Sequence, residues 1–227
     1  MPPLIIAIDG PVASGKSSIG KRLADQLGYL FFDTGVMYRV VTLAALERGV
    51  LLADEAAVTA LARNIKIEVT QPTLGDADGR QYSVWLDGRD VTWDIRSQHV
   101  DAGVSIPSAY AEVRHEMVKQ QRAIAERGDI VMVGRDIGTV VLPNADLKIY
   151  LIASAEERAR RRYTELLARE VEANYDDILA SIRQRDETDS SRKTSPLKPA
   201  ADAVILDCTS KSIDETLDAI VRLTVLY

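Results

Sequence analysis

Residues that form disulfide bonds or bind metals are scarce in this sequence. Cys208 is the only cysteine among 227 residues, so the chain cannot form an internal disulfide or a CxxC redox or zinc motif. The two histidines, His99 and His115, lack the paired spacing of an HExxH zinc site, and we expect both to be surface or structural residues. A chain with one thiol suits a reducing compartment, which predicts a cytoplasmic protein.

Long apolar runs and an excess of positive charge are also lacking. No segment reaches the roughly 18 apolar residues needed to span a membrane. The short apolar run at residues 4–8 is typical of a buried strand rather than of a signal peptide. The formal net charge of -6 disfavours a broad surface for nucleic acid or anionic lipid, so we expect neither as a partner. A site for phosphate groups must therefore gather its positive charge locally.

A phosphate-loop motif directly follows this first apolar run. Residues 10–17 read Gly-Pro-Val-Ala-Ser-Gly-Lys-Ser and match G-x-x-x-x-G-K-[ST] between an expected strand and an expected helix. The glycines let backbone N–H groups turn toward phosphates, and the helix N-terminus adds its positive dipole. Lys16 is expected to reach the β- and γ-phosphates, and Ser17 to ligate the Mg²⁺ that accompanies ATP. The expected ATP-binding residues are Gly10, Pro11, Val12, Ala13, Ser14, Gly15, Lys16, Ser17 and Ser18.

The rest of the chain alternates between strand and helix patterns, which predicts a parallel sheet between two layers of helices in a single α/β domain. Strands are expected at residues 29–32, 130–133, 147–152 and 203–206, and helices at 17–27, 36–47, 106–127 and from Ser212 onward. The segment 65–96 has a different character, with alternating and β-rich stretches separated by Gly and Asp turns. It predicts a small antiparallel insert.

A second cluster of interest is an arginine-rich helix. Ser154 and Glu157 form the sequence pattern of a capping box, and five arginines follow, at Arg158, Arg160, Arg161, Arg162 and Arg169. They could form ordinary surface ion pairs with the glutamates at Glu156, Glu157, Glu165 and Glu170. The preceding phosphate loop favours the other interpretation, in which they neutralise a triphosphate.

Three further motifs combine arginine with carboxylate or hydroxyl groups. If the helix indicated by Ile178 and Ile182 continues, Arg185, Asp189 and Arg192 follow at steps of four and three residues and extend its face. Gly134-Arg135-Asp136 directly follows an expected strand, where ligands bind in α/β sheets, although a structural ion pair is the alternative for these residues. Asp33-Thr34-Gly35 ends another strand, with Tyr38 and Arg39 one helical turn later. We expect these motifs and the phosphate loop at one edge of the sheet.

Together these motifs resemble the bacterial cytidylate kinases of the nucleoside monophosphate kinase superfamily. The resemblance covers almost the whole chain, from the phosphate loop through Asp33-Thr-Gly-Val-Met-Tyr-Arg39 and the insert. It continues through Gly134-Arg-Asp-Ile-Gly-Thr-Val-Val141, Glu156-Glu-Arg158, residues 185–192 and Pro199-Ala-Ala-Asp-Ala203. The segment 134–141 and the insert are more specific than the phosphate loop, which many ATPases share.

The resemblance implies transfer of a phosphoryl group from ATP to CMP or dCMP in pyrimidine nucleotide metabolism. An inserted lid and domain closure fit a monomer. The resemblance also implies a core (1–34, 128–153, 200–227), a monophosphate-binding part (35–127, with the insert at 65–96) and a helical lid (154–195). The residues that match family positions for the acceptor phosphate are Arg39, Arg135 and Arg192; those for the ribose are Arg185 and Asp189; those for cytosine are Ser105, Arg114 and Asp136; Thr34, where relatives often have serine, and Tyr38 complete the CMP set. The implied catalytic residues are Lys16, Arg135, Arg158 and Arg162.

Two alternatives stay open from the residues alone. A kinase of the shikimate or adenylate type would share the phosphate loop and lid, but it should lack the cytosine-reading set and the β-rich insert. A GTPase switch could use Asp76-Ala-Asp-Gly79 as its DxxG element and residues 209–211 as a base-contacting loop. The sequence contains no NKxD guanine-reading motif, which disfavours the switch.

Overall fold

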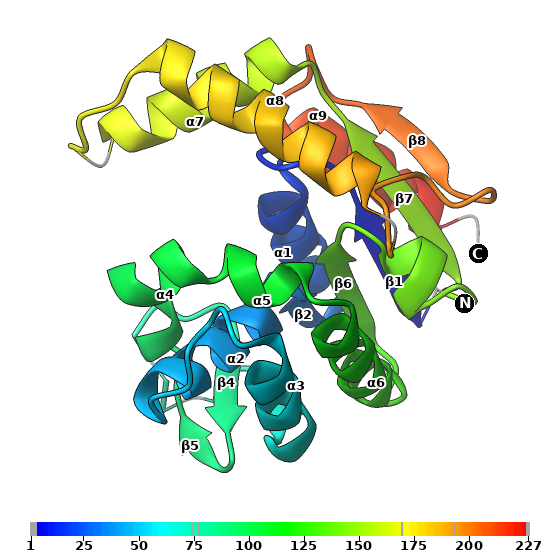
Figure 1. The fold of residues 1–227 in the computed structure, drawn as a ribbon. Coiled ribbons are helices and arrows are strands. Elements are labelled where there is room, and N and C mark those ends of the chain that lie inside the picture. Colours follow the sequence, from blue (N-terminus) through cyan, green and yellow to red (C-terminus); the bar gives the residue numbers. More distant parts are fainter. Residues whose placement is uncertain (1–3, 74, 77, 169, 193, 226–227) are drawn as a thin grey trace. The chain divides into compact units, whose positions relative to one another are not determined.

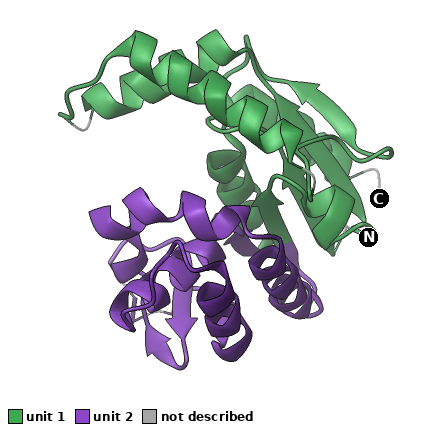
Figure 2. Cartoon of the chain, in the orientation of Figure 1, with its two compact units in different colours: residues 1–28, 131–227 green, residues 29–130 purple. Residues whose placement is uncertain are grey.

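The computed structural model describes residues 4–73, 75–76, 78–168, 170–192 and 194–225. The chain divides into two compact units, which Figure 2 draws in different colours: unit 1 is residues 1–28 with 131–227, and unit 2 is residues 29–130. The boundaries expected for the monophosphate-binding part and the lid remain predictions.

Unit 1 carries most of the central sheet (Figure 1). Its elements are β1 (Ile5–Asp9), α1 (Lys16–Leu27), β6 (Ile130–Gly134, which begins at the last residue of unit 2), the π-helical turn η2 (Ile137–Val141), β7 (Leu147–Ile152), α7 (Ala155–Ala168), α8 (Tyr175–Ser191), β8 (Val204–Asp207) and α9 (Ile213–Thr224).

Unit 2 contains short helices and a second sheet. Its elements are β2 (Leu30–Asp33), α2 (Gly35–Glu47), α3 (Glu55–Asn64), β3 (Ile67–Thr70), β4 (Ser83–Leu86), β5 (Arg89–Asp90), the 3₁₀ turn η1 (Asp94–Arg96), α4 (Gln98–Gly103), α5 (Ser105–Ala109) and α6 (Ala111–Ala125).

The larger sheet is parallel, flanked by helices and ordered β2-β6-β1-β7-β8. Ile6 of β1 lies opposite Leu147 of β7, and Ile149 of β7 lies opposite Val204 of β8. The inner strands read as continuous apolar runs because helices cover both faces of a parallel sheet; β6 is buried at every position. The edge strand β8 instead alternates between half-buried and exposed residues. This architecture confirms the α/β expectation.

The insert expected at residues 65–96 is present as a small antiparallel sheet ordered β3-β4-β5. Ile67 pairs with Leu86, and the alternate residues of β3 are buried, as period-two patterning predicts. Ion pairs connect the β4–β5 turn to the end of α2: Arg48 with Asp87 at 2.7 Å and Glu47 with Arg89 at 2.6 Å. The insert is therefore fastened to the helix that carries Tyr38 and Arg39.

The prediction of a single helix over residues 106–127 is wrong. The segment is divided into α5 and α6, because Tyr110 takes an extended conformation with ψ 122°. The Tyr110 hydroxyl donates a hydrogen bond to the backbone carbonyl of Leu52 at 2.9 Å. A contact 58 residues away thus accompanies the break, and helix periodicity cannot reveal it.

Helices α7 and α8 lie side by side as a pair (Figure 1). The Asn174 side chain begins α8 by accepting from the backbone N–H groups of Asp176 and Asp177. The helix then continues without interruption to Ser191, so the expected helix includes Arg185 and Asp189, whereas Arg192 lies just past its end with a ψ angle of 133°. Among the helices in the described part of the chain, none has the length and apolar character required to cross a bilayer.

The expected start of the last helix supplies a test of the fold. The Ser212 hydroxyl accepts from the Glu215 N–H at 3.1 Å, and the Glu215 carboxylate accepts from the Ser212 N–H at 2.8 Å. Replacing Ser212 with Ala should lower the free energy of unfolding by about 1 kcal/mol, because α9 loses its cap. Urea unfolding measures the change. Ser210→Ala, an exposed position outside the cap, is the control, and equal stabilities of the two variants would contradict the prediction.

Candidate active site

The phosphate loop joins β1 to α1, and its backbone explains its sequence. Ala13 and Gly15 have positive φ angles, 58° and 91°, which lie in the left-handed region that favours glycine. A Cβ atom on Gly10 would come within 2.6 Å of the Leu151 carbonyl oxygen, so only glycine fits beside β7. The loop therefore takes the turn that its motif predicts.

Lys16 and Ser17 open α1 at the end of this loop. The Lys16 amino group is buried and donates to the Pro11 carbonyl at 2.9 Å, which places its charge over the loop. No three His, Cys, Asp or Glu side chains cluster as a metal cage anywhere in the described ranges. A single hydroxyl at Ser17 suits Mg²⁺, which usually keeps one or two protein ligands beside nucleotide phosphates and water. His99 and His115 are exposed, as expected.

Asp9 is a site residue that the sequence interpretation missed. It ends β1 directly before Gly10, and its buried carboxylate accepts from the backbone N–H groups of Ile137 and Gly138 at 2.8 and 2.7 Å. Burial raises the pKa of Asp9 to about 6, although the two N–H groups favour its ionised form. Asp9 thereby connects the phosphate loop to the turn that follows Arg135 and Asp136. A charged residue at the end of a buried strand was the available signal.

Within unit 1, one buried carboxylate gathers two of the predicted arginines. Asp189 on α8 accepts from Arg135 Nε at 2.9 Å and pairs with Arg192 at 2.5 Å. Both arginine side chains are about four-fifths buried. Asp136, the residue after Arg135, is also buried, whereas Arg185 on α8 is exposed. The ion-pair alternative for Arg135 is therefore observed, but in a cluster of two cations and one anion rather than a simple pair.

Within unit 2, α2 and α6 bring the predicted residues Tyr38 and Arg114 together. Thr34 is the residue directly before α2, and Tyr38 and Arg39 follow on that helix. The Arg114 guanidinium lies 5.4 Å from the centre of the Tyr38 ring, a cation–π contact, and also donates to the Ser108 carbonyl at 3.4 Å. Arg39 donates to the Ile95 carbonyl at 3.1 Å and pairs with Asp101. Ser105 is exposed at the start of α5.

The arginines of α7 differ strongly in their surroundings. Arg158 is 4% exposed and makes four hydrogen bonds, which go to Ala153 O, Val12 O and both carboxylate oxygens of Asp186. Arg160 and Arg162 are 63% and 43% exposed and pair with Glu157 and Glu165, so the surface-pair alternative describes both in this structure. Arg169 lies outside the described residues.

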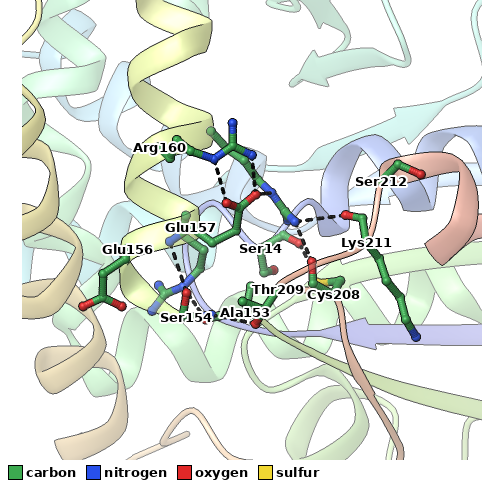
Figure 3. Close-up of polar contacts among 12 residues, drawn as sticks. Ser14, Ala153, Ser154, Glu156, Glu157, Arg160, Cys208, Thr209, Lys211 and Ser212 are labelled. Carbon is green, nitrogen blue, oxygen red and sulfur yellow. Dashed lines mark hydrogen bonds and ion pairs between the residues drawn. The ribbon is translucent and has the colours of Figure 1, made fainter.

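Figure 3 shows the start of α7 beside the phosphate loop and the turn after β8. The Ser154 hydroxyl accepts from the Glu157 N–H at 3.2 Å, which is one half of the predicted capping box. The Ser154 N–H donates to the Thr209 hydroxyl at 3.1 Å instead of to Glu157, so the second half is replaced. The Glu157 carboxylate pairs with Arg160 and Arg161. Hydrogen bonds to both guanidinium groups, with that of Arg160 the larger cause, hold the pKa of Glu157 below its usual value.

Comparison with known proteins decides between the open alternatives. The profile of the family described as Cytidylate kinase matches residues 6–225. The chain belongs to the cytidylate kinase family. A relative in Chloroflexus aggregans named "Cytidylate kinase" is 55% identical over 90% of this chain and 86% of its own. One of the same name in Bacillus licheniformis is 48% identical over 97% of this chain and 95% of its own.

A solved structure shares the fold alone. The chain of an uncharacterized protein from Eubacterium ventriosum is 12% identical, with a TM-score of 0.53, and the match covers 97% of this chain and 98% of that one. Membership of the cytidylate kinase family confirms the resemblance and sets aside the GTPase and the other kinase types. The DxxG string belongs to the insert region between β3 and β4, and its Ala77 lies outside the described residues.

The raised pKa of Asp9 predicts how stability depends on pH. An unfolded aspartate releases its proton near 3.8, whereas folded Asp9 releases it near 6, so the folded state holds an extra proton between these values. Asp9 therefore contributes stability below pH 4 that is lost as the pH rises through 6, up to about 3 kcal/mol. Urea unfolding from pH 4 to 7.5 should show the advantage of the wild type over Asp9→Asn shrinking with pH. Parallel pH profiles would contradict this assignment.

Proposed function

We propose that the protein is an ATP-dependent (d)CMP kinase, which transfers the γ-phosphoryl group of ATP to CMP or dCMP and releases ADP with CDP or dCDP. The observation that carries this proposal is the phosphate loop, with Lys16 and Ser17 in place, in a chain whose family match runs nearly from end to end. Pyrimidine nucleotide metabolism is the setting for this reaction.

The donor nucleotide would be bound by residues 10–18. Backbone N–H groups of the loop and the N-terminus of α1 favour the polyphosphate, and Lys16 neutralises the transferring group. Mg²⁺ supplies Lewis-acid charge stabilisation on the phosphate oxygens when it is bound, and Ser17 is the residue that would hold it. Lys16 would exchange its resting bond to the Pro11 carbonyl for a phosphate oxygen.

The acceptor nucleotide would be bound first of all through its phosphate group. Arg39, Arg135 and Arg192 suit the CMP phosphate, since guanidinium groups match phosphate oxygens in planar, bidentate geometry. Asp189 holds Arg135 and Arg192 in place before the dianion arrives. Asp189 and Arg185 are proposed for the ribose, and Ser105, Arg114 and Asp136 for cytosine, with Thr34 and Tyr38 as further contacts.

The chemistry needs positioning more than acid–base catalysis. The attacking group is a phosphate oxygen of CMP that already carries negative charge, so no base has to remove a proton. Two anionic substrates repel each other, and Lys16, Arg135, Arg158 and Arg162 would reduce that repulsion while charge develops on the transferred group. Closure of the α7–α8 lid would exclude water, which would otherwise consume ATP.

We further propose that the enzyme works as a cytoplasmic monomer. One buried thiol and the acidic composition support that compartment and argue against nucleic acid as a partner. ATP and CMP or dCMP are then its only required partners, with Mg²⁺ bound alongside ATP. Gel filtration with light scattering would measure the mass in solution.

The role of Lys16 can be tested by kinetics. Replacing Lys16 with Met should lower kcat by roughly 10²-fold or more, because the transferring group loses a charge partner. CMP binding should change little, since the acceptor uses other cations. Coupled ADP release measures the turnover, and a rate within a few-fold of the wild type would remove Lys16 from this role.

Base choice tests the acceptor assignment and the function together. Cytosine offers an N4 amino donor and an N3 acceptor, and uracil presents the reverse pair. The Asp136 carboxylate can accept from N4, so UMP should be disfavoured by roughly 10² to 10⁴ in kcat/KM. ADP release should be followed with each common nucleoside monophosphate. Asp136→Ala should lower the ratio of kcat/KM for CMP to that for UMP, chiefly because the activity with CMP is lost.

Two results would count against this proposal. Equal kcat/KM for CMP and UMP in the unmutated enzyme would reject the cytosine pocket and indicate a broader pyrimidine kinase. ADP release that does not depend on any added monophosphate would reject the kinase itself.

A further inference from the structure

The carbonyl groups of the phosphate loop need partners on the side away from the nucleotide. If the N–H groups of residues 10–17 converge on phosphates, the carbonyls between them face outward. The Val12 carbonyl accepts from Arg158 Nη1 at 3.1 Å. The Ser14 carbonyl faces the Cys208 sulfur at 3.5 Å, and that thiol also lies 3.0 Å from the Ile152 carbonyl. Helix α7 and the turn after β8 thus supply hydrogen-bond partners to the loop on the side away from the nucleotide.

Arg161 connects these two supports. Its Nη2 donates to the Cys208 carbonyl at 2.5 Å and to the Lys211 carbonyl at 3.2 Å, so one nitrogen holds both ends of the turn 208–211. Its Nε donates to the Glu157 carboxylate at 2.8 Å, which fixes the guanidinium on α7. The side chain is 25% exposed, so these charge-assisted bonds are partly shielded from water.

The same guanidinium lies beside the last glycine of the phosphate loop. A Cβ atom placed on Gly15 would have Arg161 Nη1 at 3.9 Å. Gly15 directly precedes Lys16 and takes the left-handed conformation that turns the chain into α1. Movement of Arg161 would therefore open space behind the residue that positions Lys16.

A second bond joins the same elements. The Ser154 N–H, at the start of α7, donates to the Thr209 hydroxyl oxygen at 3.1 Å (Figure 3). That hydroxyl in turn donates to the Asp207 carboxylate at 2.7 Å. The turn after β8 is thus attached to α7 at two places, of which Arg161 alone also borders the phosphate loop.

We infer that Arg161 is a positioning residue for the donor nucleotide. It holds the turn 208–211 and the start of α7 against the phosphate loop, so that the loop has its binding conformation before ATP arrives. This inference rests on the proposed function, which places ATP in the loop. Preorganised donors bind phosphate without the cost of ordering them during binding. Within the described residues, the hydrogen bonds of Arg161 go to Glu157, Cys208 and Lys211 and to none of the proposed acceptor residues, so the effect should be confined to ATP.

The neighbouring arginine provides a matched control. Arg160 also pairs with the Glu157 carboxylate, at 2.7 Å, but it is 63% exposed and its hydrogen bonds within the described residues go only to Glu157. Replacing either arginine with Ala removes one positive charge and one partner of Glu157. Only the change at Arg161 also releases the turn after β8.

The experiment compares Arg161→Ala with Arg160→Ala in the full-length protein. KM for ATP, KM for CMP and kcat are measured separately, and MgADP binding is measured by calorimetry without CMP. Arg161→Ala should raise KM for ATP and weaken MgADP about 5- to 30-fold. KM for CMP should stay within about two-fold, and Arg160→Ala should change neither constant beyond that. For Arg161→Lys, KM for ATP and the affinity for MgADP should lie between those of the wild type and Arg161→Ala, because a lysine ammonium can replace only some of the guanidinium hydrogen bonds.

Cys208 offers a second, independent variant. Cys208→Ala removes the thiol that lies 3.0 Å from the Ile152 carbonyl and 3.5 Å from the Ser14 carbonyl, whereas Cys208→Ser keeps one donor between them. MgADP should bind more weakly to the alanine variant than to the serine variant. Thermal melts of every variant show whether it is folded. If Arg161→Ala is unfolded, the comparison uses Arg161→Lys instead.

The possible results separate the inference from the proposed function. An unchanged KM for ATP in Arg161→Ala, or equal rises in the KM values for ATP and CMP, would overturn the positioning role. A wild-type protein that binds MgADP but phosphorylates no monophosphate would overturn the kinase proposal, while the calorimetric comparison of Arg161 with Arg160 still decides this inference. Loss of MgADP binding in both alanine variants would assign the effect to Glu157 and reject Arg161.

Discussion

The pairing of buried or half-buried arginines with aspartates is the interaction on which the candidate site depends. The chain is acidic overall, yet a phosphate site needs several cations close together. Arg135 and Arg192 share Asp189, Arg158 has Asp186, and Arg39 has Asp101. Each carboxylate reduces the repulsion among guanidinium groups and fixes their direction, which is what a phosphate dianion requires on arrival.

Local sequence signals were sufficient where local chemistry decides the structure. The phosphate loop, strand β7 at Leu147–Ile152 and the cap at Ser212 all follow from residues that are neighbours in the chain. The insert was recognisable because period-two alternation and Gly-Asp turns need no distant partner. The continuous helix through Asp189 followed from its spacing for the same reason.

Distant contacts decided the rest. Asp9 reaches Ile137 across 128 residues, and Arg158 reaches Val12 across 146, so neither role has a signature within a short window. The break at Tyr110 coincides with a hydroxyl bond to Leu52. Helix α3 is a different case, because its local signals were present and were not used: Asp54 caps it, and Val58, Leu61 and Ala62 are buried on one face. The sequence indicated which residue types serve phosphate chemistry, but it could not assign each arginine to its carboxylate, because any pairing satisfies the same charge pattern.

The single cysteine has a practical consequence. Cys208 is 1% exposed, and its sulfur lies between carbonyls of β7 and the phosphate loop. An alkylating reagent can reach this thiol only when the surrounding turn opens, and the chain contains no other thiol to compete for the reagent. The rate at which Cys208 is modified in the native protein thus measures the opening of the turn after β8, with or without a bound ligand. The labelling rate of Cys208 therefore reports how often the structure opens beside the phosphate loop.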